Sequence, residues 1–178
     1  MRLYQHPPAN THVLCLDEMG PVSAKTYTAA RWLDKRPHVE ADNGRRGKVW
    51  VFGAFEPAAG QALTVCGPRR DTANFIGLLD AVIQTWPQGE LILILDNLST
   101  HKTMDVRLWA LAHDRVRFLF QPTYAPWLNL IEPWWKTLRS LALKGRRFVA
   151  ADEIIQTIAA ATTYWNDRCH PYHWRKAV

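Results

Sequence analysis

Short apolar runs along the chain predict strands. The runs at residues 13–16 and 91–95 are wholly apolar. They are too short for a helix and too evenly apolar for a half-exposed strand, so they suit strands buried on both faces. Segments rich in β-branched and aromatic residues, bounded by Gly or Pro, add further strands. The predicted strands are residues 13–17, 25–32, 48–55, 61–66, 91–95 and 116–120, with turns at 18–21 and 57–60.

Apolar residues at helical spacing predict four helices. Asp71 is the expected N-cap of the first, which continues to Trp86 and stops before a Pro and a Gly. Ser99 or Thr100 begins the second, which extends to about His113. The third follows residue 129, and the last spans residues 151–167.

The same stripes predict which side chains the helices bury. The first is expected to bury Phe75, Leu78, Leu79, Val82, Ile83 and Trp86, and the second Met104, Leu108, Leu111 and Ala112. The third is expected to bury Ile131, Trp134, Trp135, Leu138, Leu141 and Ala142. The last is expected to bury Ile154, Ile155, Ile158, Thr162 and Trp165.

The order of these elements predicts one α/β domain. A meander of strands is followed by helix, strand, helix, strand and helix, which gives a mixed five-stranded sheet flanked by helices. The chain has 178 residues, of which 48% are hydrophobic and 21% are charged, enough for one globular domain with a real core. Residues 13–178 are expected to form this domain, and the polar residues 1–12 a tail or linker.

Three acidic residues occupy positions that are typical of catalytic or ligand-binding residues. Asp17 and Asp96 each follow an apolar strand, and Glu132 lies on the helix that follows the strand at 116–120. Open α/β sheets place their ligands at the carboxyl ends of strands. Three converging carboxylates with no paired Cys or His favour Mg²⁺ or Mn²⁺ over zinc. Such a site suits two-metal phosphoryl transfer, in which the two ions lie about 4 Å apart.

The residues around these acids match a known pattern. Leu-Asp-Asn at 95–97 is followed by His101, and the block Pro-Thr-Tyr-Ala-Pro-Trp-Leu-Asn-Leu-Ile-Glu ends at Glu132. These blocks resemble the second and third catalytic blocks of mariner-like DDE transposases, in particular the bacterial insertion-sequence branch numbered six-thirty, and Asp17-Glu18 resembles the first. The 35 residues between Asp96 and Glu132 are close to the spacing of that superfamily. The loop departs from the usual family pattern at positions 123, 125, 127 and 130, but no catalytic acid is replaced.

This resemblance implies a fold and an activity. The fold would be ribonuclease-H-like, as in retroviral integrases. Asp17, Asp96 and Glu132 would bind two Mg²⁺ or Mn²⁺ ions, water would cleave the phosphodiester at the element's ends, and the freed 3′ hydroxyl would attack target DNA. The implied partners are DNA and further copies of the chain, in a homodimer or larger synaptic assembly.

The resemblance also predicts how the element's ends are recognised. The family carries helix-turn-helix domains before the first catalytic Asp, whereas about sixteen residues precede Asp17 here. A separately encoded helix-turn-helix half is therefore expected to recognise the ends. The chain is interpreted as the second half of a split transposase, a frameshifted product or a decayed remnant.

Several neighbouring residues are predicted to support the acids. His101 is expected to orient the Asp96 loop or to touch the substrate strand, since in this reaction class the metal activates water without a protein base. Asn97 and Asn129 are expected to tie their loops by side-chain to backbone hydrogen bonds. Glu18 is expected to face away from the site, because successive strand side chains alternate.

Basic residues extend from the third acid along the chain. The predicted DNA-binding residues are Lys136, Arg139, Lys144, Arg146 and Arg147. The net charge of +6 favours a polyanionic partner if it is clustered. Glu132 and Lys136 are four residues apart on a helix, so a surface ion pair is the alternative interpretation. The cationic loop at 34–48 is interpreted mainly as a solvated loop, with a DNA-facing loop as the alternative.

Cysteine usage and hydropathy indicate the compartment. Three widely spaced Cys do not form a disulfide framework, and neither a signal peptide nor a membrane span is present, so a cytoplasmic, nucleoid-associated protein is expected. A zinc site at Cys169, His170 and His173 is disfavoured, because no matching cluster exists elsewhere.

Two other functions compete with transposition. A catalytically silent DNA-binding or dimerising partner would keep the basic residues and lose metal dependence. A nuclease of the same fold would act in repair or RNA cleavage.

Overall fold

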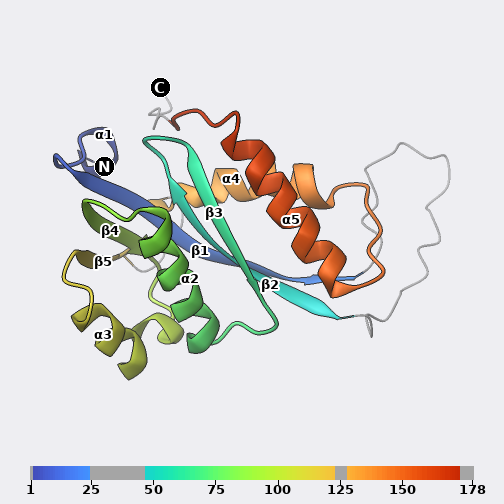
Figure 1. Cartoon of the computed structure of the whole chain (residues 1–178), viewed down its shortest axis with the longest axis horizontal. Coiled ribbons are helices and arrows are strands. Elements are labelled where there is room, and N and C mark those ends of the chain that lie inside the picture. Colours follow the sequence, from blue (N-terminus) through green and yellow to red (C-terminus); the bar gives the residue numbers. More distant parts are fainter. Residues whose placement is uncertain (1, 25–46, 123–127, 173–178) are drawn as a thin grey trace.

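The computed structural model describes residues 2–24, 47–122 and 128–172. Figure 1 shows a twisted sheet with helices on both faces. In chain order the elements are α1 (Arg2–Gln5), β1 (Thr11–Ser23), β2 (Lys48–Glu56), β3 (Gln61–Gly67), α2 (Thr72–Thr85), β4 (Glu90–Leu95), the 3₁₀ turn η1 (Ser99–Lys102), α3 (Met104–Leu111), β5 (Val116–Phe120), α4 (Ile131–Leu138), the π-helical turn η3 (Arg139–Leu143) and α5 (Ala151–Asn166).

The predicted mixed five-stranded sheet is confirmed. Its strand order is β3-β2-β1-β4-β5. β2 pairs antiparallel with both β1 and β3, whereas β1, β4 and β5 run parallel. The carboxyl ends of β1, β3, β4 and β5 therefore lie at one end of the sheet, which we call the carboxyl edge. The predicted strand at 25–32 and most of the cationic loop at 34–48 lie outside the described residues.

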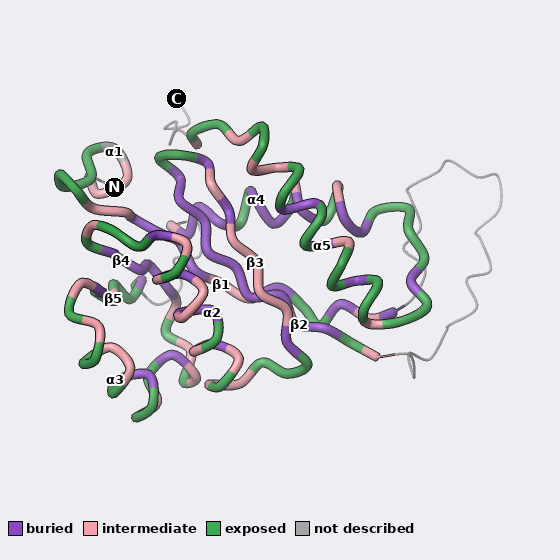
Figure 2. The backbone as a smooth tube through the Cα atoms, viewed as in Figure 1, coloured by how far each residue is buried: buried purple, intermediate pink, exposed green. Residues whose placement is uncertain are grey.

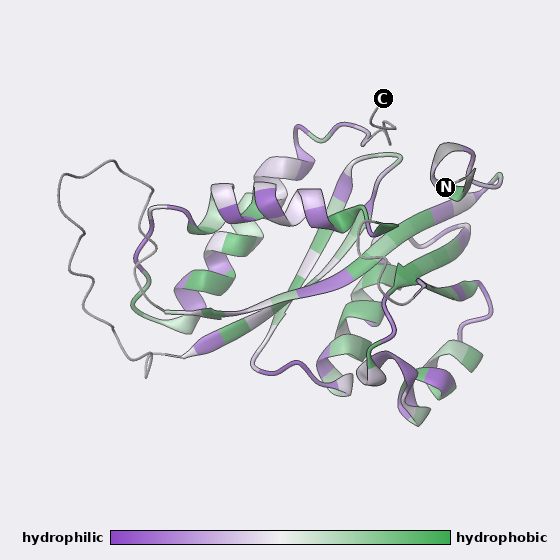
Figure 3. Cartoon of the chain, turned by 180° about the vertical axis from the view of Figure 1, so that it is seen from behind, coloured by the Kyte–Doolittle hydropathy of each residue, from purple (hydrophilic) through white to green (hydrophobic). Residues whose placement is uncertain are grey.

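Each face of the sheet has its own hydrophobic core. Helices α4 and α5 pack on one face, through side chains that include Trp134, Trp135 and Ile158. Helix α2 packs on the other face, through Phe75 and Leu79 among others. In Figure 3 the central strands are mostly hydrophobic, whereas the helices alternate hydrophobic and hydrophilic turns, as expected for helices at a surface. The central strands are therefore buried on both sides, as their apolar runs predict.

The predicted turn at residues 18–21 is wrong, because β1 continues to Ser23. Its pairing with β2 shifts between Met19 and Val22, which marks a β-bulge that contains Gly20 and Pro21. A bulge accommodates a proline, which cannot donate to the ladder, without ending the strand. Asp17 consequently lies inside a strand, opposite Gly53 of β2.

The second predicted helix is divided into two segments, and the side of it that is buried differs from the prediction. Residues 99–102 form η1, and α3 starts only at Met104. The Met104, Leu108 and Leu111 side chains, predicted to be buried, are 65%, 56% and 76% exposed. Figure 2 shows α3 mostly exposed at the edge of the molecule. The helix packs instead through Val106, and Trp109 Nε1 donates to Asp80 of α2 at 2.7 Å, so contacts with α2 fix its rotation.

The remaining helix predictions are confirmed with small exceptions. Asp71 caps α2 by accepting from the Asn74 backbone N–H at 3.0 Å. Helix α5 buries Ile154, Ile158 and Thr162 as predicted, but Ile155 is 38% exposed, because the buried stripe continues through Ala161 instead.

All three cysteines are free. None of the helices in the described ranges is long and apolar enough to cross a membrane.

The segment before β1 packs more closely than a free tail. Residues 2–5 form the short helix α1, and the Tyr4 ring packs against the core on the α4 face. The Tyr4 hydroxyl donates to the Leu128 carbonyl oxygen at 2.7 Å. This contact ties the beginning of the chain to the loop before Glu132.

Candidate active site

The two candidate aspartates lie level with each other across the sheet. The parallel pairing of β1 with β4 ends at Cys15 opposite Ile94. Asp17 and Asp96 each follow two residues later, on neighbouring strands, so the register brings both carboxylates to the carboxyl edge. The sequence predicts both residues, but only the register shows that they are side by side.

Asp17 is held in a largely buried position on the α4 face. Its Oδ2 accepts a hydrogen bond from Trp135 Nε1 at 2.9 Å. Burial raises the pKa of Asp17 to about 6, against the hydrogen bond from Trp135, and the charge of Glu132 adds to the increase. Asp17 is therefore half protonated at about pH 6 and mostly ionised at pH 7.

Gly53 makes room for the tryptophan that holds Asp17. It lies opposite Asp17 in the register, and a Cβ at this position would lie 2.4 Å from the Cη2 of Trp135. Real Cβ atoms do not approach other atoms so closely, so only glycine fits without a shift. The sequence contains this glycine, but nothing local indicates its purpose.

Asp96 is anchored through one carboxylate oxygen. Its Oδ1 accepts from the Leu98 backbone N–H at 3.0 Å and lies 3.0 Å from His101 Nδ1. Its Oδ2 has no protein partner among residues 2–24, 47–122 and 128–172. Partial burial tends to raise the pKa of Asp96, but the hydrogen bonds from His101 and Leu98 hold it below its usual value. Asp96 is therefore ionised, with one oxygen available to a ligand.

His101 links Asp96 to Glu18. Its Nε2 lies 2.7 Å from Glu18 Oε1, and the His101 and Glu18 side chains are 1% and 3% exposed. Both ring nitrogens face carboxylates, which only accept, so both must donate and the ring must carry a positive charge. Burial opposes this charge, but the hydrogen bonds to Asp96 and Glu18 raise the pKa of His101 to about 9. The predicted orienting role of His101 is supported by this geometry.

Glu18 is the functional neighbour that the sequence interpretation missed. It does face away from Asp17, as strand alternation predicts, but it lies on the α2 face, where it reaches His101. The available signal was a second carboxylate directly after a candidate metal ligand. Its partner is 83 residues away in the chain, so the contact was not predictable from local pattern.

Glu18→Gln tests the charge of this buried link. Because the pKa of His101 is higher in the folded protein, the protonated ring contributes to the unfolding free energy. This contribution is fully present below pH 6.5 and is lost as the pH rises through about 9. Glutamine still accepts the hydrogen bond but lacks the charge. The drop in unfolding free energy between pH 6.5 and 9.5, measured by urea denaturation, should therefore be smaller in Glu18→Gln than in the wild type.

The exposed Glu90→Gln is the matched control for this experiment, because Glu90 lies at the other end of β4. It should keep the wild-type pH dependence. An equal drop in the wild type and Glu18→Gln would contradict a charged His101–Glu18 pair.

Glu132 lies in the first turn of α4 and is exposed. Asn129, just before this helix, donates from Nδ2 to the Leu16 carbonyl oxygen at 2.9 Å, one residue before Asp17. Asn97 donates in the same way to the Gln121 carbonyl oxygen. Both asparagines therefore tie their loops to the backbone as predicted.

The predicted surface ion pair between Glu132 and Lys136 does not form, since no such pair lies within 4 Å in the described chain.

The three acids do not form a closed metal site as they stand. In the described ranges no three Asp, Glu, His or Cys side chains are close enough together to hold an ion. Residues 123–127, within the predicted third block, lie outside these ranges. The donor set nevertheless fits Mg²⁺ or Mn²⁺, because all three groups are carboxylates and one Asp96 oxygen has no protein partner.

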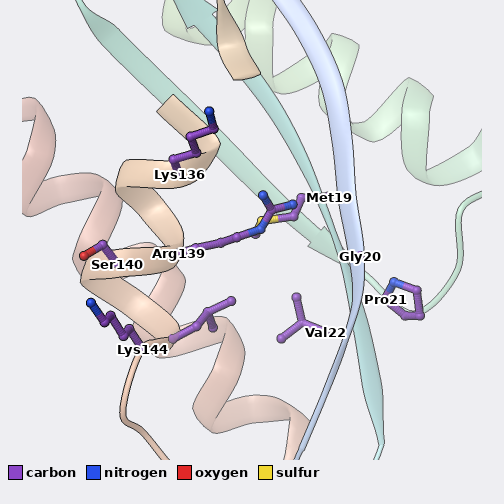
Figure 4. A pocket seen from close by; sticks show the side chains of 9 residues that line it. Met19, Gly20, Pro21, Val22, Lys136, Arg139, Ser140 and Lys144 are labelled. Atoms are coloured by element: carbon purple, nitrogen blue, oxygen red, sulfur yellow. The ribbon is translucent and has the colours of Figure 1, made fainter. Parts of the chain in front are cut away.

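The predicted DNA-binding residues fall into two groups. Lys136, Arg139 and Lys144 line a cavity of about 610 Å³ between the β1 bulge and the helical segment α4–η3. In the close view of this cavity, these three side chains extend from α4–η3 beside the strand that carries Met19 to Val22 (Figure 4). Arg146 and Arg147 lie instead beside Phe148 and α5. We call the first group the α4 cation cluster.

The carboxyl-terminal residues do not form a metal site in the described part of the chain. The His170 ring packs against Trp165 and Tyr172, with ring centroids 5.3 and 5.9 Å away. Cys169 is half-buried, and His173 lies outside the described residues. The disfavoured zinc interpretation gains no support.

Comparison with known families gives the identity of this fold. A family model described as DDE superfamily endonuclease matches residues 12–155, most of the chain and all three candidate acids. The chain belongs to this DDE superfamily. The predicted family is thereby confirmed.

Two relatives are similar to this DDE superfamily member. The 39 kDa protein of insertion element IS630 from Shigella sonnei is 27% identical over 116 residues, which are 65% of this chain and 34% of the relative. Protein y4pE/y4sA of Sinorhizobium fredii (strain NBRC 101917 / NGR234) is 29% identical over 119 residues, 66% of this chain and 83% of the relative. The chain thus spans about a third of the length of the first relative.

Solved structures confirm the fold. The Mos1 transposase paired-end complex with left transposon end matches 93% of this chain and 55% of its own, with a TM-score of 0.60 and 14% identity. The catalytic core domain of BIV integrase matches 89% of this chain and 86% of its own, with a TM-score of 0.56 and 12% identity. These likenesses show the predicted ribonuclease-H-like, integrase-like architecture.

Proposed function

We propose that this chain is the catalytic domain of a transposase, which cleaves DNA at the ends of a mobile element and joins the freed 3′ ends to target DNA. The observation that carries the proposal is the register that brings Asp17 and Asp96 level at the carboxyl edge, with Glu132 close enough for its charge to raise the pKa of Asp17. Membership of the DDE superfamily supports the same reaction class.

Asp17, Asp96 and Glu132 are the residues that would hold two divalent ions, Mg²⁺ or Mn²⁺. Such ions, when bound, activate the attacking oxygen and stabilise the leaving oxygen of a phosphodiester. A similar fold, the catalytic core domain of HTLV-2 integrase, was solved in complex with magnesium.

The chain's own residues prepare this site. Trp135 fixes one oxygen of Asp17, and His101 with the Leu98 backbone N–H fixes one oxygen of Asp96. Each carboxylate is thereby held before a ligand arrives, which lowers the reorganisation needed for catalysis. The positive charge of His101 keeps Asp96 ionised, so it needs no deprotonation before it binds a cation.

The α4 cation cluster supports DNA as the substrate. Lys136 and Arg139 lie one and two helical turns beyond Glu132, Lys144 follows the end of η3, and all three are exposed. Phosphate groups are the usual partners of such unpaired lysines and arginines next to a DNA-processing site.

We also propose assembly as a homodimer or larger synaptic complex near the nucleoid, with recognition of element ends by a helix-turn-helix partner.

The proposed function is tested with short DNA duplexes at low salt, where non-specific DNA binding is strong. Reactions contain Mn²⁺, Mg²⁺ or EDTA. Nicked or strand-joined products are expected with either metal and absent with EDTA. Product formation that is equal in EDTA would contradict the metal-dependent mechanism.

The catalytically silent partner is the second candidate. The observation that favours it is that the three acids are not gathered into a metal site in the described residues. It predicts DNA binding without any product, with every metal and also after addition of the product of an upstream reading frame.

Protonation of Asp17 predicts a pH limit for metal binding. The pKa of about 6 means that a metal ion must displace a proton from Asp17 at lower pH. The apparent Mn²⁺ affinity, measured by calorimetry, should fall by up to about tenfold per pH unit below pH 6. An affinity that is constant between pH 5 and 7 would show that Asp17 does not bind the ion, and Asp17→Asn gives the baseline without this ligand.

A further inference from the structure

The loop between β3 and α2 carries two arginines at the carboxyl edge. β3 runs in the same direction as β1 and β4, so Arg69 and Arg70, which follow its end, lie at the same end of the sheet as Asp96. These arginines therefore lie at the same end of the sheet as the candidate active site, although they are distant from Asp96 in sequence.

Arg70 is held in place by an aromatic ring. Its Cζ lies 5.0 Å from the centroid of the Trp50 ring, and Trp50 is half-buried against the α2-face core opposite Gly67. A guanidinium stacked on an aromatic face loses conformational freedom but keeps its N–H donors. Within the described residues these donors have no protein acceptor, so Arg70 is restrained and available.

Two other arginines, Arg115 and Arg117, have partners within the protein. Arg115 donates to the carbonyl oxygens of Gly89, Ile83 and Trp86, where α2 ends. Arg117 lies 3.6 Å from Glu90, near the opposite end of the sheet. In contrast, Arg69 and Arg70 are exposed and make no hydrogen bond or ion pair within the described ranges. Within these ranges, Arg69 and Arg70 therefore do not stabilise the fold through hydrogen bonds or ion pairs.

The two cationic surfaces flank the acids from opposite faces of the sheet. The α4 cation cluster lies beside the β1 bulge on the α4 face, whereas Trp50, under Arg70, packs on the α2 face. Both surfaces are level with the β1 bulge, which begins two residues beyond Asp17, because Trp50 lies on β2 beside this bulge. A polyanion that crosses the carboxyl edge over the acids can contact both surfaces.

We propose that Arg69 and Arg70 form a second phosphate-binding surface, which holds the DNA strand as it leaves the catalytic acids on the α2 face. This inference rests on the proposed function, because it takes DNA as the substrate. The planar guanidinium fork suits the two non-bridging oxygens of a phosphodiester, and such contacts position DNA without reading its sequence.

The test is DNA binding measured as a function of salt. A fluorescently labelled duplex of arbitrary sequence is titrated in EDTA, so that no cleavage occurs, and fluorescence anisotropy gives the affinity between low and moderate salt. Each lost phosphate contact lowers the slope of log affinity against log salt by about 1. Arg70→Ala should lower the slope by about 1, and the Arg69→Ala/Arg70→Ala double variant by about 2.

Two controls separate contact from general charge. Arg117→Ala removes the same charge near the other end of the sheet and should keep the wild-type slope. Arg70→Lys loses most of the stacking on Trp50 but keeps a cation, and it should also keep the slope, which excludes a folding defect at Trp50.

The outcomes distinguish this inference from the proposed function. A wild-type slope in the double variant, or an equal loss in Arg117→Ala, overturns the inference, while metal-dependent cleavage by the wild type still supports the proposed function. A wild-type chain that binds no duplex at any salt overturns both.

Discussion

Asp96→Asn is expected to reduce metal-dependent cleavage of DNA by about 10³-fold or more, equivalent to about 4 kcal/mol of transition-state stabilisation. Asparagine keeps the shape of the side chain and can still accept from the Leu98 backbone N–H and from His101. It lacks the negative charge that a divalent ion requires. The rate of nicking with Mn²⁺, under single-turnover conditions, measures the effect.

Asp105→Asn is the matched control for this variant. Asp105 is exposed in the first turn of α3, so its loss removes the same charge without touching the carboxyl edge. It should keep wild-type activity within about twofold, as is usual for surface substitutions. Thermal unfolding of both variants shows whether the fold is retained. Wild-type activity in Asp96→Asn would remove this residue from the catalytic set.

Gly53→Ala is expected to destabilise the fold by about 1–3 kcal/mol, although it adds only one methyl group. The added Cβ would lie 2.4 Å from Cη2 and 2.8 Å from Cζ2 of Trp135, and 3.0 Å from Cδ1 of Ile131. These side chains are almost fully buried, so they cannot move aside at low cost. Urea denaturation measures the loss of unfolding free energy.

The same substitution should also reduce cleavage activity in protein that remains folded. Trp135 holds Asp17 through its indole N–H, so a displaced ring moves the carboxylate away from its position. Loss of stability with full activity would show that Trp135 is only a packing residue.

Gly77→Ala is the matched control for Gly53→Ala and is expected to have the opposite effect on stability. Gly77 lies inside α2, and a Cβ there would meet nothing within 4 Å. Alanine is the better helix former, so this variant should be more stable by about 0.5–1 kcal/mol, with unchanged activity. Destabilisation by both substitutions would contradict the argument from steric fit.

Local pattern was sufficient for much of the sheet and for helix α2. The run at residues 91–95 predicts a doubly buried strand because continuous apolar sequence has no exposed face, and β4 is that strand. Asp71 and the stripe to Trp86 predict α2 for an equally local reason, since capping and helical period involve residues three or four positions apart.

Prediction failed where a contact with a distant element decided the result. The apolar stripe of α3 was assigned to the core, but contacts of Val106 and Trp109 with α2 turn the opposite side of the helix inward. The turn predicted at residues 18–21 is a bulge, because pairing with β2 carries β1 past its Gly-Pro step. Helical period and turn propensity do not specify which partner an element meets.

The sequence by itself determined most of the strands and helix α2, and it indicated the candidate acids at positions 17, 96 and 132, because these depend on hydrophobic period and on motif. Only the tertiary structure decided that Asp17 lies level with Asp96, that Glu18 reaches Asp96 through His101, and that Arg70 lies near the same edge. These relations depend on strand register and on contacts between residues far apart in the chain. Such contacts form only when the whole sheet pairs, so no local pattern contains them.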